Sequence, residues 1–516
     1  YEQGEVTGIV TETPIMREFK DCKLKKPWHY NQSEMIPVDA DIETVRKALD
    51  ELVRHHDILR AVYVNDTLEI LSYEKSKKFE LTEYDVRGHK DIDDEVNEIC
   101  TGIQASIDLA NGPLMKTAIF DTDFGKYLFI CIHHYAIDGV SWRILLEDFD
   151  TVLEGYKNNQ KVKLPAKTAS FIEWSRTLEE YRTTEELLEE KAFWDTFEKH
   201  KEEYRLAIDE GVLTEKINGS ILFELSESVT EKLLRHSARA YNTQINDLLL
   251  AALGMAVKRL TGQDSVSVGV EGHGRESIHR PINIDRTIGW FTSMYPVVLK
   301  CTSIVEDAII ETKDMLRVIP NNGLGYGLLY DTDLNSCVDI YFNYLGEMDS
   351  EVEYTGTQMI LPQGQSVASE NRMEGYLNIN AWVTEKKFMC EVTYNNCKDD
   401  FVARFVTLYQ KSMETVTGWC ISRREAHITE SDMYRLTPLQ EGMYFHNQLD
   451  RDDTSYIIQE SFRTNIRINY SFLRRSLDCL TEKYEVLKTT LAETKSGQVK
   501  QYIDENRSIE IKEKKY

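Results

Sequence analysis

Two adjacent histidines, an aspartate and a glycine occur together in the stretch HHYAIDG, residues 133–139. A histidine side chain ordinarily titrates near neutral pH, and Asp138 is a carboxylate four residues after His134, so this stretch could carry a general acid or base. Both are also possible metal ligands, but a zinc site needs a third ligand, and the chain has no H-E-x-x-H pattern. A histidine pair that only completes hydrogen bonds in a core is the third alternative. Four such residues within seven positions favour acid–base chemistry.

The stretch VEGHGRE, residues 270–276, is the second chemical candidate. Gly272 and Gly274 without a third glycine are a weak match to a dinucleotide-binding loop, and a glycine turn after a strand is commonly only a turn. Glu271 is of more interest, because it would stand at the end of a strand. If it faced His134 across a cleft, one group could remove a proton from a carbon atom and the other could return one to the opposite face.

The surrounding patterns place both candidates at the ends of strands. Residues 126–132, KYLFICI, are an apolar run of strand length, and residues 140–153 have apolar side chains at helical spacing. The histidine cluster is therefore expected where a strand ends and a helix begins. Further on, we expect a charged crossing helix at 191–207 and a buried helix at 243–262. These elements predict two α/β halves within residues 1 to about 425.

The chain begins the same pattern twice. Residues 42–63 combine helical apolar spacing with a strand-like end, and residues 470–491 repeat this at an offset of 428. At that offset residue 516 corresponds to residue 88, which precedes the histidine cluster. The second copy is therefore expected to be a fragment, separated from the first by a polar segment.

Composition narrows the class of protein. The chain has 516 residues with 61 basic and 87 acidic side chains, a net charge of −26, and no basic patch that would attract a nucleic acid. Its nine cysteines are scattered without a C-x-x-C pair, which indicates reduced thiols rather than a disulfide framework. The first residues lack a basic-then-apolar leader, and no apolar run is long enough to span a bilayer. We therefore expect a cytoplasmic protein.

These motifs resemble those of the condensation and epimerization domains of nonribosomal peptide synthetases. HHYAIDG matches the HHxxxDG pattern of the whole superfamily, and VSWR after the glycine, together with VEGHGRE, is similar to the epimerization form. Five further motifs resemble the family: WHYNQS (28–33), HHDILRAVY (55–63), RTIGWFTSMYPV (286–297), IPNNGLGYGLL (319–329) and FNYLGEM (342–348). Near the end, YRLTPLQEGMYFH (434–446) and KYEVLKTTL (483–491) resemble the opening of a following condensation domain.

The resemblance implies an α/β fold of two chloramphenicol-acetyltransferase-like subdomains. They would form a V-shaped pseudo-dimer with the active site at their interface. The expected bounds are an N-terminal subdomain at 1–185, a C-terminal subdomain at 186–420, a linker at 421–435, and the N-terminal fragment of a condensation domain at 436–516. The chain is then a piece of a larger synthetase.

The activity that the resemblance implies is L-to-D inversion at Cα of an aminoacyl or peptidyl thioester. The substrate would be held on the phosphopantetheine arm of an upstream carrier domain, and a condensation domain would follow. The chain itself would bind neither a cofactor nor a metal. Neither a nucleic acid nor a membrane is expected as a partner, and the setting would be antibiotic biosynthesis.

The resemblance also implies roles for single residues. His134 would be one acid/base group and Glu271 the other. Asn343 and Tyr344 resemble residues that line the active site and help to hold the intermediate, although Tyr344 has the alternative interpretation of a packed strand aromatic.

The other motif positions are expected to support the site. His133 would be structural, and Asp138 would orient its loop through an arginine, for which Arg275 and Arg286 are both candidates. Gly139 would allow close backbone approach, and the start of the following helix would place partial positive charge near the site.

Three classes of function stay open. A carrier-linked epimerase is favoured. An amide-forming condensation domain shares HHxxxDG but ordinarily lacks the glutamate of VEGHGRE. A noncatalytic docking module would be expected to lose His134 or Glu271, and both are present.

Overall fold

The structure, a computed structural model, consists of two compact units, Tyr1–Gly418 and Trp419–Tyr516. It describes residues 1–215, 219–330, 334–347, 361–371, 375–425, 433–449, 459–461, 470–493, 498–504, 509 and 511. No disulfide joins any of the nine cysteines, all of which lie in these ranges. No helix in this part of the chain is both long and apolar enough to cross a lipid bilayer.

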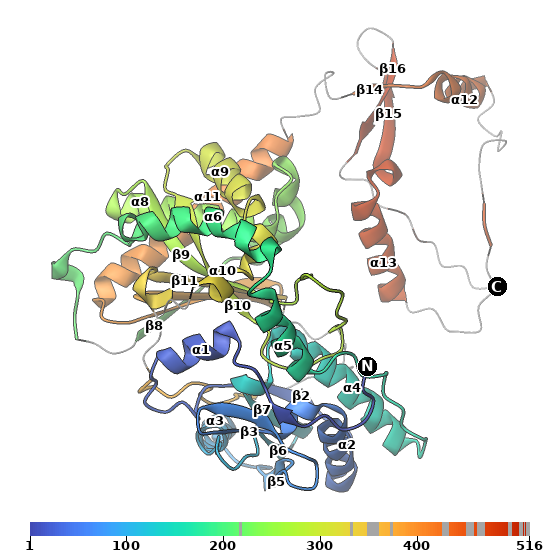
Figure 1. Cartoon of the computed structure of the whole chain (residues 1–516). Helices are drawn as coiled ribbons and strands as arrows, with labels where there is room; N and C mark the ends of the chain where they lie inside the picture. Colours follow the sequence, from blue (N-terminus) through green and yellow to red (C-terminus); the bar gives the residue numbers. More distant parts are fainter. Residues whose placement is uncertain are drawn as a thin grey trace. The chain divides into compact units, whose positions relative to one another are not determined.

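The N-terminal half of the first unit is built on a four-stranded sheet with the order β2-β7-β6-β5 (Figure 1). Its strands are β2 Asn31–Pro37, β5 Glu80–Asp85, β6 Met115–Thr122 and β7 Gly125–His133. A small sheet beside it is made of β1 Gly8–Ile9, β3 Ala61–Val64 and β4 Thr67–Ile70. The apolar run at 126–132 is therefore a strand, as predicted, and it is central because the apolar residues on both of its faces are buried.

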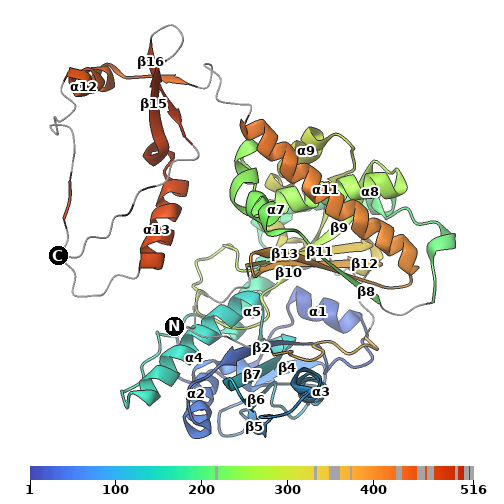
Figure 2. The same cartoon turned by 180° about the vertical axis from the view of Figure 1, so that it is seen from behind.

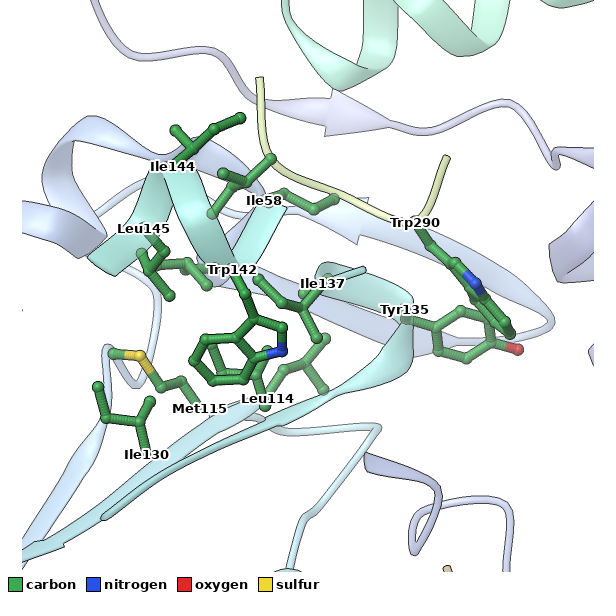
Figure 3. Packing of buried hydrophobic residues seen from close by; sticks show 14 of the residues in the cluster. Ile58, Leu114, Met115, Ile130, Tyr135, Ile137, Trp142, Ile144, Leu145 and Trp290 are labelled. Atoms are coloured by element: carbon green, nitrogen blue, oxygen red, sulfur yellow. The ribbon is translucent and has the colours of Figure 1, made fainter. Parts of the chain in front are cut away.

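Helices cover this sheet. They are α1 Pro14–Asp21, α2 Ile42–His55, α3 Ile92–Ala105, α4 Gly139–Lys157 and α5 Phe171–Tyr181. Helices α2 and α4 pack against each other, and their apolar stripes close the core. Figure 3 shows the indole ring of Trp142, on the first turns of α4, among Leu114, Met115 and Ile137.

The C-terminal half is built on a six-stranded sheet with the order β10-β9-β11-β12-β13-β8. Its strands are β8 Gly219–Glu224, β9 Ser265–Gly272, β10 Ser293–Lys300, β11 Ile340–Glu347, β12 Leu377–Thr384 and β13 Lys387–Tyr394. Side chains of β12 and β13 alternate between buried and half-buried, so one face of the sheet is covered and the other is partly open.

The helices of this half are α6 Glu185–His200, α7 Glu227–Glu231, α8 Ile245–Thr261, α9 Val305–Arg317, α10 Tyr326–Leu329 and α11 Asp399–Glu425. Figure 2 shows α11 running along α8 and α9 over the sheet. The buried helix predicted at 243–262 is α8, and Gly262 ends it in the left-handed conformation at a φ of 81°. The expected boundary between the halves falls at the start of α6, which is the crossing helix predicted from its charge.

Several segments of the C-terminal half contact the N-terminal half, and two of them lie beside the histidine cluster and its neighbouring strand. The loop at 361–371 forms a bridge between Tyr30 and Val367 and a hydrogen bond between Ser33 and Gln363. The segment at 284–291 contacts the start of α4. The cluster that ends β7 therefore lies where the two halves meet.

The second unit repeats the opening of the first at the predicted offset. Helix α13 Tyr470–Lys483 and the short helix η10 Glu485–Lys488 correspond residue for residue to α2 and to η1 Asp57–Arg60. Three strands, β14 Tyr434–Arg435, β15 Thr489–Glu493 and β16 Val499–Ile503, pair in the order β14-β16-β15, which matches β1-β4-β3. Helix α12 Pro438–Leu449 takes the place of α1. The predicted internal repeat is confirmed.

The segment expected as a linker, 421–435, is only partly described. Its first five residues belong to α11, which ends at Glu425, and β14 occupies its last two. Residues 426–432 lie outside the described residues. The polar segment 421–435 can be a linker or an extension of the preceding helix, and α11 extends into its first five residues.

Candidate active site

The two histidines of the cluster have different surroundings. His133 is fully buried; its Nε2 donates to the carbonyl of Pro27 at 2.9 Å, and its Nδ1 accepts from the Tyr135 amide at 3.1 Å. Burial lowers the pKa of His133 to about 3. With both nitrogens engaged by backbone groups, His133 holds the strand end in place.

His134 is partly exposed and presents a ring nitrogen to a side chain. The Nε2 atoms of His134 and Gln32 are 3.1 Å apart, and the Gln32 Oε1 accepts from the Trp142 indole at 2.9 Å. The Nδ1 of His134 is buried and has no hydrogen-bond partner among the described residues. Desolvation lowers the pKa of His134 to about 4, so the ring is neutral at physiological pH.

Aromatic rings enclose His134. The Trp290 ring lies 4.4 Å from the imidazole between centroids, and the Tyr30 ring lies 5.6 Å away. Figure 3 shows Trp290 beside Tyr135. These rings exclude water from one side of the imidazole, which strengthens electrostatic interactions there.

Asp138 caps helix α4 and ties it to the other half. Its Oδ1 accepts from the Ser141 amide at 2.8 Å, and its Oδ2 accepts from the Phe291 amide at 2.9 Å. The guanidinium of Arg275 lies 3.6 Å from Asp138, donates to the Ser141 hydroxyl, and stacks on the Phe291 ring. Of the two arginines considered, the structure thus places Arg275 beside Asp138.

Arg286 belongs to a different cluster. It donates to Glu147 at 3.0 Å and to Asp148 at 2.5 Å, and Asp148 also accepts from His56 at 3.0 Å. His55, His56 and Asp148 form the one group of three potential metal ligands found in the described part of the chain. Arg286 already compensates the charge of Asp148, so the geometry is explained without a cation. His134 and Asp138 have no third ligand among the described residues.

Glu271 and Asn343 come together at the ends of two neighbouring strands. Strand β9 ends at Gly272 and runs parallel to β11, which puts Asn343 level with Glu271. The Asn343 amide donates to Glu271 Oε2 at 2.8 Å. Glu271 is exposed. The pair therefore presents an exposed carboxylate to which an amide group donates a hydrogen bond.

Tyr344 lies on the opposite face of β11 from Asn343, because consecutive strand residues point to opposite faces. Its ring stacks on Phe388 of β13 with centroids 6.3 Å apart, and burial raises the pKa of the phenol to about 12. The structure therefore does not bring the Tyr344 ring beside Asn343, and the role of Tyr344 at the site stays a prediction.

Two glycines near the site differ in whether the fold requires a residue without a side chain. Gly274 has a φ of 66°, and a Cβ there would meet the Phe291 carbonyl oxygen at 1.6 Å, so the turn after Glu271 requires glycine. Gly139 is exposed, and a Cβ there would meet nothing within 4 Å. The fold itself does not require glycine at 139, so the space in front of the α4 N-terminus is open.

The segment 290–294 links the two candidate groups. Trp290 packs on His134, and four residues later Met294 pairs with Glu271 across β10 and β9. Four extended residues span at most about 14 Å. The same five residues line a pocket with Thr13 and Pro14 at the start of α1, and with Trp174 of α5. Neither His134 nor Glu271 lines this pocket, and the two groups are linked by the segment itself, which contacts the imidazole at Trp290 and pairs with Glu271 at Met294.

Sequence reasoning missed Gln32, Trp142 and Trp290. All three stand inside the quoted motifs WHYNQS, VSWR and RTIGWF. Gln32 lies in a motif quoted only for its resemblance to the family, and no local pattern identifies its partners, which are 102 and 110 residues away.

Comparison with known proteins gives the family. The model of the Condensation domain family matches residues 22–425 and again residues 430–515. The chain is 32% identical to bacitracin synthase 3 of Bacillus licheniformis over 99% of its own length and 36% identical to tyrocidine synthase 2 of Brevibacillus parabrevis over 84%. It spans only 9% and 13% of those relatives.

Solved structures agree with this assignment. The epimerization domain from the third module of tyrocidine synthetase B is 34% identical, with a TM-score of 0.73 over 82% of this chain and 100% of that one. The first condensation domain of the CDA synthetase is 16% identical, with a TM-score of 0.60 over 80% and 96%, and supports the fold alone. Because the family model matches most of the chain, once in each unit, the chain belongs to the condensation domain family.

Proposed function

We propose that the first unit inverts the Cα configuration of an aminoacyl or peptidyl thioester. The thioester would be carried on the phosphopantetheine arm of a carrier domain, as part of a nonribosomal peptide synthetase. The observation that carries the proposal is the Glu271–Asn343 pair, linked by the short segment 290–294 to a neutral imidazole at His134. The 34% identity to an epimerization domain across the whole of that domain supports it.

The chemistry needs a base on one face of Cα and an acid on the other. His134 takes the Cα proton, and the electron pair of the broken C–H bond moves into the thioester carbonyl to give an enolate. Protonated Glu271 then gives its proton to the opposite face of Cα. His134 is left protonated and Glu271 ionised, and both reset by exchange with solvent. Solvent hydrogen therefore enters Cα.

Fixed dipoles stabilise the enolate oxygen in this scheme. The first turn of α4, beginning at Gly139, directs its free amide groups and its positive end towards the open space at residue 139. Asn343 holds the Glu271 carboxyl in one orientation, so little rotamer freedom is lost when a substrate binds. No cofactor is needed for this step, and the arm comes from the carrier domain.

Two partners belong to this proposal. A carrier domain, upstream or a separate protein, would supply the loaded arm. The second unit would be the start of a following condensation domain, which the second match of the family model, at 430–515, supports. The product would be a D-configured residue passed on in antibiotic synthesis.

Solvent deuterium tests the proposal directly. With an aminoacyl-loaded carrier in deuterated water, the protein should wash deuterium into Cα, and chiral analysis of the released acid should show both configurations. His134→Ala should abolish the exchange, and His89→Ala, which changes an exposed histidine of the same half, should leave it intact. Persistent exchange in His134→Ala would remove the imidazole from the mechanism.

The substitution Glu271→Gln distinguishes the proposed epimerization from the alternative, amide-forming condensation. This variant should change exchange from the L and D thioesters unequally, because each isomer presents its proton to a different group. Condensation should tolerate the same substitution. Amide formation between two loaded carriers, without deuterium in Cα, would establish the alternative instead.

A further inference from the structure

Gln32 connects the indole of Trp142 to the imidazole of His134. Gln32 lies on β2, the edge strand beside β7, and Trp142 lies on the first turns of α4. The indole N–H to Oε1 distance is 2.9 Å, and the distance between the Nε2 atoms of Gln32 and His134 is 3.1 Å. Trp142 is itself fixed in the core (Figure 3).

The donor and acceptor roles in this chain of contacts are determined by chemistry. An indole N–H can only donate, so the Gln32 atom that faces it must be the carbonyl oxygen. The amide NH2 then faces His134, and an amide nitrogen can only donate. The Nε2 of His134 must therefore be the acceptor, and the neutral ring carries its hydrogen on Nδ1.

A protonated ring would meet a donor rather than an acceptor at Nε2. At Nε2 it would present an N–H to the amide donor of Gln32, and Nδ1 has no partner among the described residues. Rotating the Gln32 amide would not remove this repulsion between two donors, because its NH2 would then face the Trp142 N–H instead. The contact thus disfavours the imidazolium in addition to the desolvation that lowers the pKa of His134 to about 4.

The other titratable groups around His134 do not supply the missing acceptor. His133 is held neutral by backbone contacts, and the Tyr30 ring lies against the imidazole. The charge of Asp138 raises the pKa of His134 by less than burial lowers it, and Arg275 lies 3.6 Å from Asp138. Glu34, two residues along β2 on the same face as Gln32, is partly buried, and burial raises its pKa to about 7.

We infer that Gln32 is a positioning residue that selects the Nδ1–H tautomer of His134 and keeps Nε2 as the unprotonated, basic atom. The lone pair that accepts from Gln32 is also the one that would take the substrate proton, so the amide withdraws from Nε2 when the acyl group enters. This inference rests on the proposed function for its kinetic readout but not for its titration readout.

The substitution Gln32→Glu tests it by reversing the polarity of the side chain. A carboxylate accepts from the Trp142 indole and from a protonated His134 together, so it should favour the imidazolium. An opposite charge at this range raises a histidine pKa by about 1–3 units. The C2–H exchange of the His134 ring, followed by mass spectrometry across pH, reports that pKa in the whole protein without substrate.

Two readouts should move together in Gln32→Glu. The His134 ring titration and the acid limb of kcat/KM for Cα exchange should both rise by about 1–3 pH units, with activity recovered at higher pH. Gln32→Met, which removes the donor and adds no charge, should raise both by less. Gln160→Glu, the same charge change at an exposed position, should move neither.

Several outcomes would overturn the inference. One is a His134 titration in Gln32→Glu that stays at its wild-type position while thermal unfolding shows the variant folded. Another is an acid limb that moves in Glu34→Gln and not in Gln32→Glu, since this would assign the titration to Glu34. If the ring titration shifts as expected but wild-type protein never exchanges Cα, the inference stands and the proposed function fails.

Discussion

The chemical character of each side chain here depends on its hydrogen-bond partners rather than on its residue type. His133 and His134 are neighbours, yet backbone groups occupy both nitrogens of the first, and a side-chain amide faces the second. Glu271 is exposed but held by Asn343. One histidine is therefore structural, and the other is left with a single basic atom that faces a replaceable partner.

Asn343 and Tyr344 are neighbours, but we expect their substitution to have different effects, because Asn343 contacts Glu271 and Tyr344 packs on Phe388. Asn343→Ala should lower kcat/KM for Cα exchange by about 10- to 100-fold, because a hydrogen bond to a charged group contributes about 1.5–3 kcal/mol. Tyr344→Phe should keep the rate within a few-fold, since the ring stacks on Phe388 on the other face. A loss of exchange in Tyr344→Phe as large as in Asn343→Ala would show that the phenol reaches the site.

At the scale of elements, the site is assembled by the ends of strands and the start of a helix. Strand β7 delivers His134, helix α4 begins at once with Asp138 as its cap, and strands β9 and β11 deliver Glu271 and Asn343. Asp138 also accepts from the Phe291 amide of the other half. One carboxylate thus starts the helix and joins the halves.

Asp138→Ala should therefore lower the free energy of unfolding by more than the loss of a helix cap alone would. The variant leaves Arg275 buried without its carboxylate, and breaking a buried ion pair costs about 3–5 kcal/mol. Asp41→Ala provides the control, because Asp41 caps α2 in the same way, at 2.8 Å from the Thr44 amide, but is exposed. A cap alone contributes about 1 kcal/mol.

Equilibrium unfolding of both variants measures the difference in free energy of unfolding. Adding Arg275→Met to Asp138→Ala should recover part of the loss, since the stranded charge is then removed. Equal destabilisation by Asp138→Ala and Asp41→Ala would show that the contact with the other half contributes nothing.

The sequence predicted the elements well because their signals are local. The apolar run before His133, the helical spacing after Gly139 and the left-handed glycine after α8 each lie within a few residues of the feature they determine. Contacts between residues that are far apart in the sequence have no comparable local pattern. The Gln32–Trp142 and Asp138–Phe291 bonds join residues 110 and 153 positions apart, and no periodicity in one segment identifies its partner in the other.

The direction of the Tyr344 side chain also could not be predicted from the sequence. Asn343 and Tyr344 are adjacent in a motif, and the motif gives no indication of which of them faces Glu271. The parallel pairing of β9 with β11 decides this, because it sets Asn343 level with Glu271 and turns Tyr344 to the covered face. Register is a property of the assembled sheet and is read from strand pairing.

At the scale of the whole chain, one supersecondary unit occurs twice in different surroundings. In the first unit, α2 packs on α4, and η1 is buried against the core. In the second, the corresponding apolar side chains are less buried: Leu473 and Leu477 of α13 are half-buried, and Leu480 and the apolar residues of η10 are exposed. Ile58 is 2% exposed and Val486, its equivalent, is 73% exposed; Leu59 and Leu487 are 1% and 45% exposed. The same local sequence pattern thus folds to the same local structure with and without a core above it.

Matched charged substitutions at this equivalent pair test how far the two units are independent. Ile58→Asp places an unpaired carboxylate in the core and should lower the free energy of unfolding of the first unit by about 3–5 kcal/mol. Val486→Asp adds the same group to an exposed position and should leave that transition, and the rate of Cα exchange, at wild-type values. Differential scanning calorimetry and the deuterium assay measure both. If Val486→Asp lowered the unfolding temperature of the first unit as much as Ile58→Asp, the stability of residues 1–418 would depend on the second unit, and the two copies could not be treated as separately folded.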